Sequence, residues 1–255
     1  MRRMLRFGAL LAAITLAFAG AAQAGPFSDW AAVVVAGDNH ASGGGQTEVF
    51  DNGRRDLAKA LADAGFAQQN ILQFSIQAEK YADPKPYSAR PFRNVIEQLN
   101  GLTQRARGGC LIYMTSHGAP QGIVMGDGLL QPATLASVID DACGKRPTVA
   151  VISACFSGIF VPDLEWPNRM VMTAARPDRT SFGCGATDRY TYFDDCFLQS
   201  LRAAANLQDL SVKIPACVSA REKVEHASPP SEPQVSIGPQ MRASLPLYTF
   251  SKPGG

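Results

Sequence analysis

Apolar runs of strand length alternate along this chain with segments whose apolar residues recur at helical spacing. The spacing predicts strands at residues 30–37, 71–75, 110–116, 148–154 and 169–175, and a last strand within residues 229–238. It predicts helices over residues 51–66, 91–105, 132–143, 190–205 and 209–225, and a hairpin at residues 123–131. Strands that alternate with helices form a mostly parallel sheet covered on both faces. We therefore expect an α/β fold built as a three-layer sandwich.

The first residues have the pattern of a targeting segment. Three arginines precede an apolar run at residues 8–20, and Ala22-Gln23-Ala24 follows with the small residues that a signal peptidase accepts. The run is shorter than the roughly 18 apolar residues of a membrane helix, and no later stretch reaches that length. The alternatives are a buried core helix and an uncleaved anchor. We expect residues 1–24 to be a cleaved signal peptide, and the mature chain to be secreted or periplasmic without a membrane span.

Composition limits what the rest of the chain can do. Residues 25–255 number about 230, which is enough for one α/β domain with a full core. The formal net charge is +2 and the basic residues are scattered, so no nucleic-acid partner is expected. Three histidines and no Cys-x-x-Cys pair offer little for a zinc site, and no cofactor is expected. The oligomeric state stays open.

Two reactive residue types follow neighbouring predicted strands. His117 ends the third strand and Cys155 ends the fourth, so both are expected at the same edge of the sheet. A nucleophilic thiol needs a nearby imidazole, and Gly118 allows the close backbone approach that an oxyanion-binding amide requires. Each residue also has a structural interpretation: Cys155 as a buried apolar side chain or half of a disulfide, and His117 as a turn residue.

The strand-SHG and strand-AC blocks around His117 and Cys155 resemble the signature of legumain-type cysteine peptidases, family C13, within the caspase-like clan. Further similar segments are VVVAG (33–37), FRNVIEQLNGL (92–102), MTAARPDRTSFGC (172–184), YTYFDDCF (190–197) and PSEPQVSIG (230–238), the last as in bacterial relatives. The resemblance implies a caspase-like sandwich and an endopeptidase that acts on peptides or proteins.

The resemblance also implies residue roles. Cys155 attacks the scissile carbonyl, His117 protonates the leaving amine, and the backbone N–H groups of Gly118 and Cys155 hold the oxyanion. Asp195 matches the aspartate of the substrate pocket, and Ser181 matches a serine of the pocket wall. The alternative for Asp195 is a solvated helix face.

Two departures from the family bear on specificity. Ser153 stands two residues before the cysteine, where legumains have an acidic pocket residue. With Asp195 as the main pocket charge, we rank the residue before the scissile bond (P1) as Asn first, basic second and Asp third, because a partly buried carboxylate requires a donor. The second departure is the glycine-rich loop at residues 39–50, which is most simply interpreted as a mobile segment. The alternative is that Asn39 or His40 assists the catalytic residues.

Alternatives to hydrolysis remain open. If an amine instead of water attacks the acyl-enzyme, the protein is a transamidase or ligase. If the site is catalytically inactive, the protein is an exported binding domain. An α/β-hydrolase is disfavoured because the run SACFSG lacks the first glycine of its motif.

The six cysteines allow two disulfides and one spare thiol if Cys155 stays free. We expect one bridge between Cys184 and Cys196, because they flank the predicted pocket segment.

Overall fold

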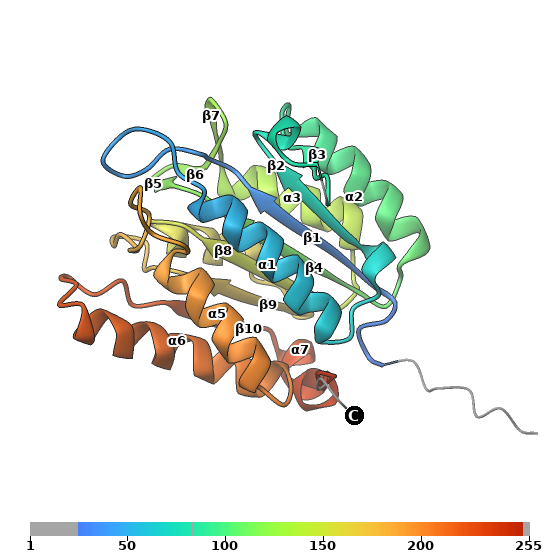
Figure 1. Cartoon of the computed structure of the whole chain (residues 1–255). Coiled ribbons are helices and arrows are strands. Elements are labelled where there is room, and N and C mark those ends of the chain that lie inside the picture. The colour runs from blue at the N-terminus through green and yellow to red at the C-terminus, as the bar shows by residue number, and fades with distance from the viewer. Residues whose placement is uncertain (1–24, 83, 252–255) are drawn as a thin grey trace, which may run out of the picture.

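The computed structural model describes residues 25–82 and 84–251, and the predicted signal peptide at 1–24 lies outside the described residues. A seven-stranded sheet forms the centre, in the order β10-β9-β8-β4-β1-β2-β3, as Figure 1 shows. Among the described strands of this seven-stranded sheet, only β10 runs antiparallel to its neighbour. The strands are β1 (Trp30–Ala36), β2 (Ile71–Ser75), β3 (Tyr87–Ser88), β4 (Gly109–Thr115), β8 (Thr148–Ser153), β9 (Arg169–Thr173) and β10 (Gln234–Ile237). The mostly parallel sheet predicted from the sequence is confirmed.

Helices cover both faces of this sheet. One face carries α1 (Val49–Asp63), α5 (Tyr192–Ala203) and α6 (Leu207–Val224), and the other carries α2 (Arg93–Arg105), α3 (Pro132–Cys143) and α4 (Val161–Leu164). A short helix, α7 (Pro239–Ser244), follows β10. No helix in the described part of the chain is long and apolar enough to cross a membrane. The predicted three-layer sandwich is therefore present.

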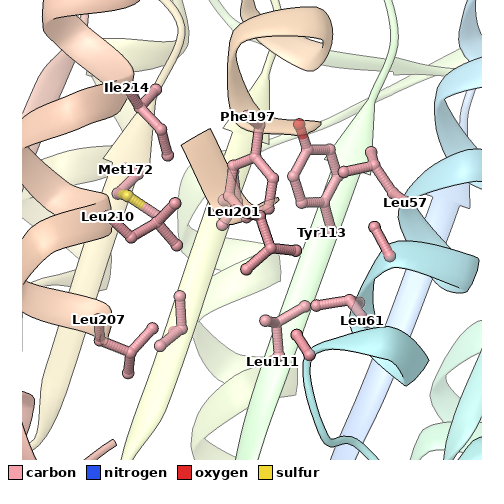
Figure 2. Packing of buried hydrophobic residues seen from close by; sticks show 14 of the residues in the cluster. Leu57, Leu61, Leu111, Tyr113, Met172, Phe197, Leu201, Leu207, Leu210 and Ile214 are labelled. Carbon is pink, nitrogen blue, oxygen red and sulfur yellow. The ribbon is translucent and has the colours of Figure 1, made fainter. Parts of the chain in front are cut away.

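The strand residues alternate between the two helical layers, which is why their runs are apolar throughout. Tyr113 and Leu111 of β4 pack with α1, α5 and α6, whereas Ile112 packs with α2 and α3. Figure 2 shows the first of these clusters, in which Leu57 and Leu61 of α1 meet the β4 side chains. The sheet is thus buried on both faces, and its functional surface is left at the strand ends.

A small antiparallel sheet extends from the end of β4. It consists of β5 (Gly118–Ala119), β6 (Gly122–Met125) and β7 (Gly128–Leu130). The turn between β6 and β7 contains Gly126 with φ +62°, a left-handed conformation that glycine adopts readily. The hairpin predicted at residues 123–131 is confirmed.

Two disulfides fasten helices to the body of the domain. Cys110 at the start of β4 is bonded to Cys143 at the end of α3, and Cys196 of α5 is bonded to Cys217 of α6. Cys184 is free, so the predicted Cys184–Cys196 bridge is wrong. The packing of α5 against α6 brings Cys217, twenty-one positions away, next to Cys196.

Candidate active site

The structure places His117 and Cys155 level with each other on neighbouring strands. β4 and β8 are adjacent and parallel, and their register pairs Thr115 with Ser153. Each candidate residue lies two positions beyond its partner in that pair, at the carboxyl edge of the sheet. The expectation that both residues emerge at one edge is confirmed.

A cavity of about 690 Å³ opens at this edge. The loops after β1, β4 and β8 and the long loop between β9 and α5 form its walls. In Figure 1 the blue loop after β1 approaches the β5–β6 pair on this side. The lining residues are His40, Ala41, Ser42, His117, Cys155, Thr180, Ser181, Phe182, Gly183, Cys184, Gly185 and Asp188. The candidate thiol and imidazole therefore share one cavity with the predicted wall residue Ser181.

One ring nitrogen of His117 is held by the backbone. Its Nε2 lies 2.9 Å from the carbonyl oxygen of His40, and its ring meets Phe50 edge-on with centroids 5.1 Å apart. A carbonyl oxygen only accepts hydrogen bonds, so Nε2 carries the proton in this arrangement. The other nitrogen, Nδ1, is then the one that can take up and release a proton.

The Cys155 thiol is hydrogen-bonded to Ser181. The backbone N–H of Ser181 donates to Cys155 Sγ at 3.3 Å, and Sγ lies 3.6 Å from the Ser181 hydroxyl and 3.7 Å from its carbonyl oxygen. Among the described residues, no hydrogen bond joins Cys155 to His117. Ser181 thus contacts the candidate nucleophile as well as lining the cavity.

The backbone turns sharply after Cys155. Phe156 has φ 57° and ψ 12°, a left-handed conformation uncommon for a residue with a side chain. Its N–H donates to the carbonyl oxygen of Arg179 at 2.8 Å, which ties the turn to the loop before α5. The turn lets Cys155 project from the strand end instead of continuing into the sheet.

Gly118 makes the closest approach to this turn. A Cβ atom on Gly118 would lie 2.0 Å from the carbonyl oxygen of Cys155 and 3.1 Å from the Ala154 side chain. Only glycine fits there without moving the chain. The two segments assigned to oxyanion binding are therefore in direct backbone contact.

Asp188 is an acidic cavity residue that the sequence interpretation missed. It lies in the loop before α5, and its Oδ2 accepts a hydrogen bond from the Gly185 N–H at 2.7 Å. The described residues that line the cavity include no Lys or Arg. The sequence does place an acidic residue, Asp188, just after the segment 172–184 that resembles a pocket wall. Residues 185–189 have no helical or strand periodicity, so the sequence does not indicate which way the Asp188 side chain points.

Cys184 also lines the cavity as a second free thiol. Burial raises the pKa of the Cys184 thiol above its ordinary value, and the neighbouring Cys155 adds to the shift. Cys184 is therefore a weaker acid than an exposed cysteine.

Asp195 and Ser153 occupy other positions than predicted. Asp195 forms an ion pair with Arg221 of α6, whose guanidinium lies 4.1 Å from the ring centre of Tyr192. Ser153 is buried, with its hydroxyl oxygen 3.3 Å from that of Thr191. Neither is among the residues that line the cavity, so the placement of both in the pocket is corrected.

Asp194 lies beneath the site and is fully buried. The Tyr113 hydroxyl donates to its Oδ1 at 2.7 Å, and the Thr115 hydroxyl donates to its Oδ2 at 2.6 Å. Burial raises the pKa of the Asp194 carboxyl, and these hydrogen bonds oppose the shift. The carboxyl joins the first turn of α5 to the end of β4, two residues before His117.

No group of three or more His, Cys, Asp or Glu side chains in the described chain is arranged to hold a metal ion. The reactive side chains that line the cavity include a thiol and an imidazole.

Comparisons with known proteins identify the family and the fold. A model of the peptidase C13 family matches residues 92–226, which include both His117 and Cys155. Among solved structures, the fold is similar to that of caspase-1 from Spodoptera frugiperda, with a TM-score of 0.60 at 15% identity over 84% of this chain and 88% of that chain. The match confirms the caspase-like sandwich. No curated protein matches the sequence.

Proposed function

Because this chain belongs to the peptidase C13 family and is a cysteine peptidase, we propose that it is an exported endopeptidase with Cys155 as nucleophile and His117 as proton carrier. The observation that supports this most is the placement of the two residues. They leave adjacent strands at the same level and line one cavity, and a backbone carbonyl fixes the His117 ring.

The proposed reaction uses both nitrogens of His117. Nδ1 takes the proton of the Cys155 thiol, and the sulfur attacks the scissile carbonyl carbon while Nε2 stays bonded to the His40 carbonyl. The C–N bond then breaks, and Nδ1 returns the proton to the leaving amine. Water, deprotonated by Nδ1, hydrolyses the thioester and restores the thiol.

The backbone contact between Gly118 and Cys155 supports their proposed role as the oxyanion site. Charge develops on the carbonyl oxygen during the attack, and N–H groups fixed beforehand stabilise it most effectively. The packing of Gly118 against the Cys155 carbonyl keeps the two segments at a constant spacing. A constant spacing of this kind is what a preformed oxyanion site requires.

Asp188 now carries the proposed specificity in place of Asp195. It is the acidic side chain among the described lining residues, and Ser181 lies in the same cavity. A carboxylate that is partly removed from water requires a donor-bearing partner. We assign Asn or a basic residue to the P1 position on this basis.

Export is supported by the pattern of cysteine use. Four cysteines form two disulfides, which persist mainly in oxidising compartments. The predicted cut after Ala24 is tested by sequencing the amino terminus of the exported protein, which should begin at Gly25.

The enzymatic proposal is tested with a peptide library that varies P1. Cys155→Ala should abolish cleavage, and His117→Ala should lower kcat/KM at least about 100-fold, the usual effect of losing a general acid–base. His226→Ala, at the end of α6 and outside the cavity, is the matched control and should keep its activity. Cleavage by Cys155→Ala at the wild-type rate would overturn the proposal, provided that circular dichroism shows both proteins folded.

A further inference from the structure

The carboxylate of Asp38 organises the loop that holds His117. Asp38 follows the end of β1 and is buried. Its Oδ1 lies 2.7 Å from the Asn39 nitrogen, 3.1 Å from the His40 nitrogen and 2.7 Å from His40 Nδ1. One carboxylate oxygen therefore accepts from two successive backbone N–H groups and from an imidazole.

The remaining backbone groups of the same two residues are also engaged. The Asn39 carbonyl accepts from the Thr47 N–H at 2.9 Å, and the His40 carbonyl faces His117 Nε2 at 2.9 Å. The loop enters this arrangement from Gly37, whose N–H donates to the Thr115 carbonyl at 3.0 Å. The His40 carbonyl lies in the next peptide unit, whose own N–H, that of Ala41, donates to the Gly45 carbonyl at 3.0 Å. Asp38 fixes the turn that leads into this unit, and the two sets of bonds together constrain the direction of the His40 carbonyl.

We propose that Asp38 is a positioning residue for catalysis, which aims the His40 carbonyl at His117 and so keeps the His117 proton on Nε2. This inference rests on the proposed function of Cys155 and His117. If the carbonyl turned away, the proton of the neutral ring could move to Nδ1, and that nitrogen would no longer take the proton of the thiol.

The geometry attributes the effect to the shape of the turn rather than to the charge of Asp38. An aspartate or asparagine side chain can bond to the N–H two residues ahead, because its oxygen is at the correct distance from the backbone. A glutamate keeps the charge but moves the oxygen by one methylene. Asp38→Asn should thus preserve the arrangement, whereas Asp38→Glu should disturb it.

The test measures the rate at which iodoacetamide alkylates Cys155, resolved by peptide mass spectrometry so that Cys184 is counted separately. Asp38→Ala and Asp38→Glu should slow the reaction at least about tenfold, up to the loss for His117→Ala, which we expect at about 100-fold or more. Asp38→Asn should stay within about threefold of wild type, because a neutral amide oxygen still accepts these bonds, although more weakly.

Asp209→Ala is the matched control for this series. Its carboxylate also accepts a backbone N–H, that of Ala205 at 3.0 Å, but it lies on α6 away from the cavity. The control should change stability without changing the alkylation rate. His40→Ala keeps the carbonyl and should lose less than Asp38→Ala.

A second measurement reads the proton directly. The chain has three histidines, so nitrogen-15 spectra of labelled protein give three ring systems. Wild type and Asp38→Asn should show His117 protonated at Nε2, and Asp38→Glu should show a mixture of tautomers.

Three outcomes would overturn the proposal. They are wild-type alkylation in folded Asp38→Glu, a loss in Asp38→Asn as large as that in Asp38→Glu, and a loss in His40→Ala at least as large as that in Asp38→Ala. If Asp38→Ala does not fold, the comparison of Asn with Glu decides. If His117→Ala is alkylated as fast as wild type, the proposed dyad is wrong and this inference is wrong with it. If His117→Ala is alkylated slowly while the Asp38 variants are alkylated as fast as wild type, only the inference about Asp38 is wrong.

Discussion

At the scale of single residues, two adjacent aspartates have opposite surroundings. Asp194 is enclosed beneath the sheet by hydroxyl donors, while Asp195 faces α6 and pairs with Arg221. Successive helix positions point about 100° apart, so two neighbours in sequence reach different layers. The buried carboxyl has no cationic partner among its described hydrogen bonds, and this gives it a pH-dependent effect on stability.

Asp194→Asn should change how stability depends on pH. Because burial raises the pKa of Asp194 in the folded state, the folded chain keeps a proton that the unfolded chain releases above about pH 4. Wild-type stability therefore falls as pH rises between the two pKa values, by up to about 1.4 kcal/mol per pH unit. The variant should lack this slope in urea unfolding measured from pH 4 to 8. Parallel pH profiles for the two proteins would contradict the assignment.

Asp188→Asn should change specificity more than it changes chemistry. Removing the charge leaves a basic P1 side chain without its carboxylate, so kcat/KM for P1 Arg should fall about tenfold or more relative to P1 Asn. Asp127→Asn, in the exposed turn of the β6–β7 hairpin, is the matched control and should leave the ratio unchanged. An unchanged ratio in Asp188→Asn would remove Asp188 from the pocket.

The placement of the candidate dyad could be predicted from the sequence, and that of the pocket charge could not. His117 and Cys155 each follow an apolar run that predicts a buried strand. The carboxyl ends of parallel strands lie at the same edge of the sheet, so residues that follow two such strands lie at that edge. Asp188 lies in a loop whose direction depends on contacts with Gly185 and with the segment after β1. The second contact, in which the Ser42 N–H donates to the Cys184 carbonyl, joins residues far apart in sequence, and no local spacing indicates it.

At the scale of elements, the meeting of β5 with the turn after β8 leaves no room for a side chain. Gly118→Ala would place a methyl group 2.0 Å from the Cys155 carbonyl oxygen. Moving the backbone apart should cost about 1–3 kcal/mol of stability and remove most of the activity. Gly128→Ala, in the same small sheet with open space around it, is the control and should have little effect. Thermal unfolding and peptide cleavage of both variants test the difference, and a fully active Gly118→Ala enzyme would argue against the oxyanion assignment.

Element boundaries follow the apolar pattern closely where that pattern is regular. The strand at residues 71–75 and the helix at residues 132–143 have the predicted limits. Helix α1 begins at Val49 rather than at the predicted Asp51, because Val49 and Phe50 are buried against Ala36. Asp51, which the sequence predicted as the first residue of that helix, therefore lies inside its first turn, where its carboxylate accepts a hydrogen bond from Arg54.

At the scale of the whole molecule, the two disulfides join helices to other elements on opposite faces of the sheet. The pairing could not be read from spacing, because Cys184 is nearer to Cys196 in sequence than Cys217 is. Cys196 is bonded to Cys217 because α5 packs against α6, and this contact forms only when the helical layer is assembled. Peptide mapping under non-reducing conditions should find Cys110 with Cys143 and Cys196 with Cys217.

Removing the bridge between α5 and α6 should destabilise the protein without abolishing the fold. In the chain-entropy account, a closed loop of 21 residues contributes about 3 kcal/mol. The double variant Cys196→Ala with Cys217→Ala should lose about that amount in urea unfolding. Under reducing conditions the free energy of unfolding of the wild type should approach that of the variant. The variant measured under the same conditions accounts for the loss of the Cys110–Cys143 bridge, which both proteins share. Equal stability of the two proteins in oxidising buffer would show that the bridge contributes nothing.

The cavity draws its walls from segments that begin at His40 and end at Asp188. A ribosome releases the first of these long before the last, and the helix that supports them from below, α5, emerges later still. A partly made chain therefore contains the proposed nucleophile, Cys155, without the complete cavity around it. The order of synthesis therefore delays the complete cavity until most of the chain has been made.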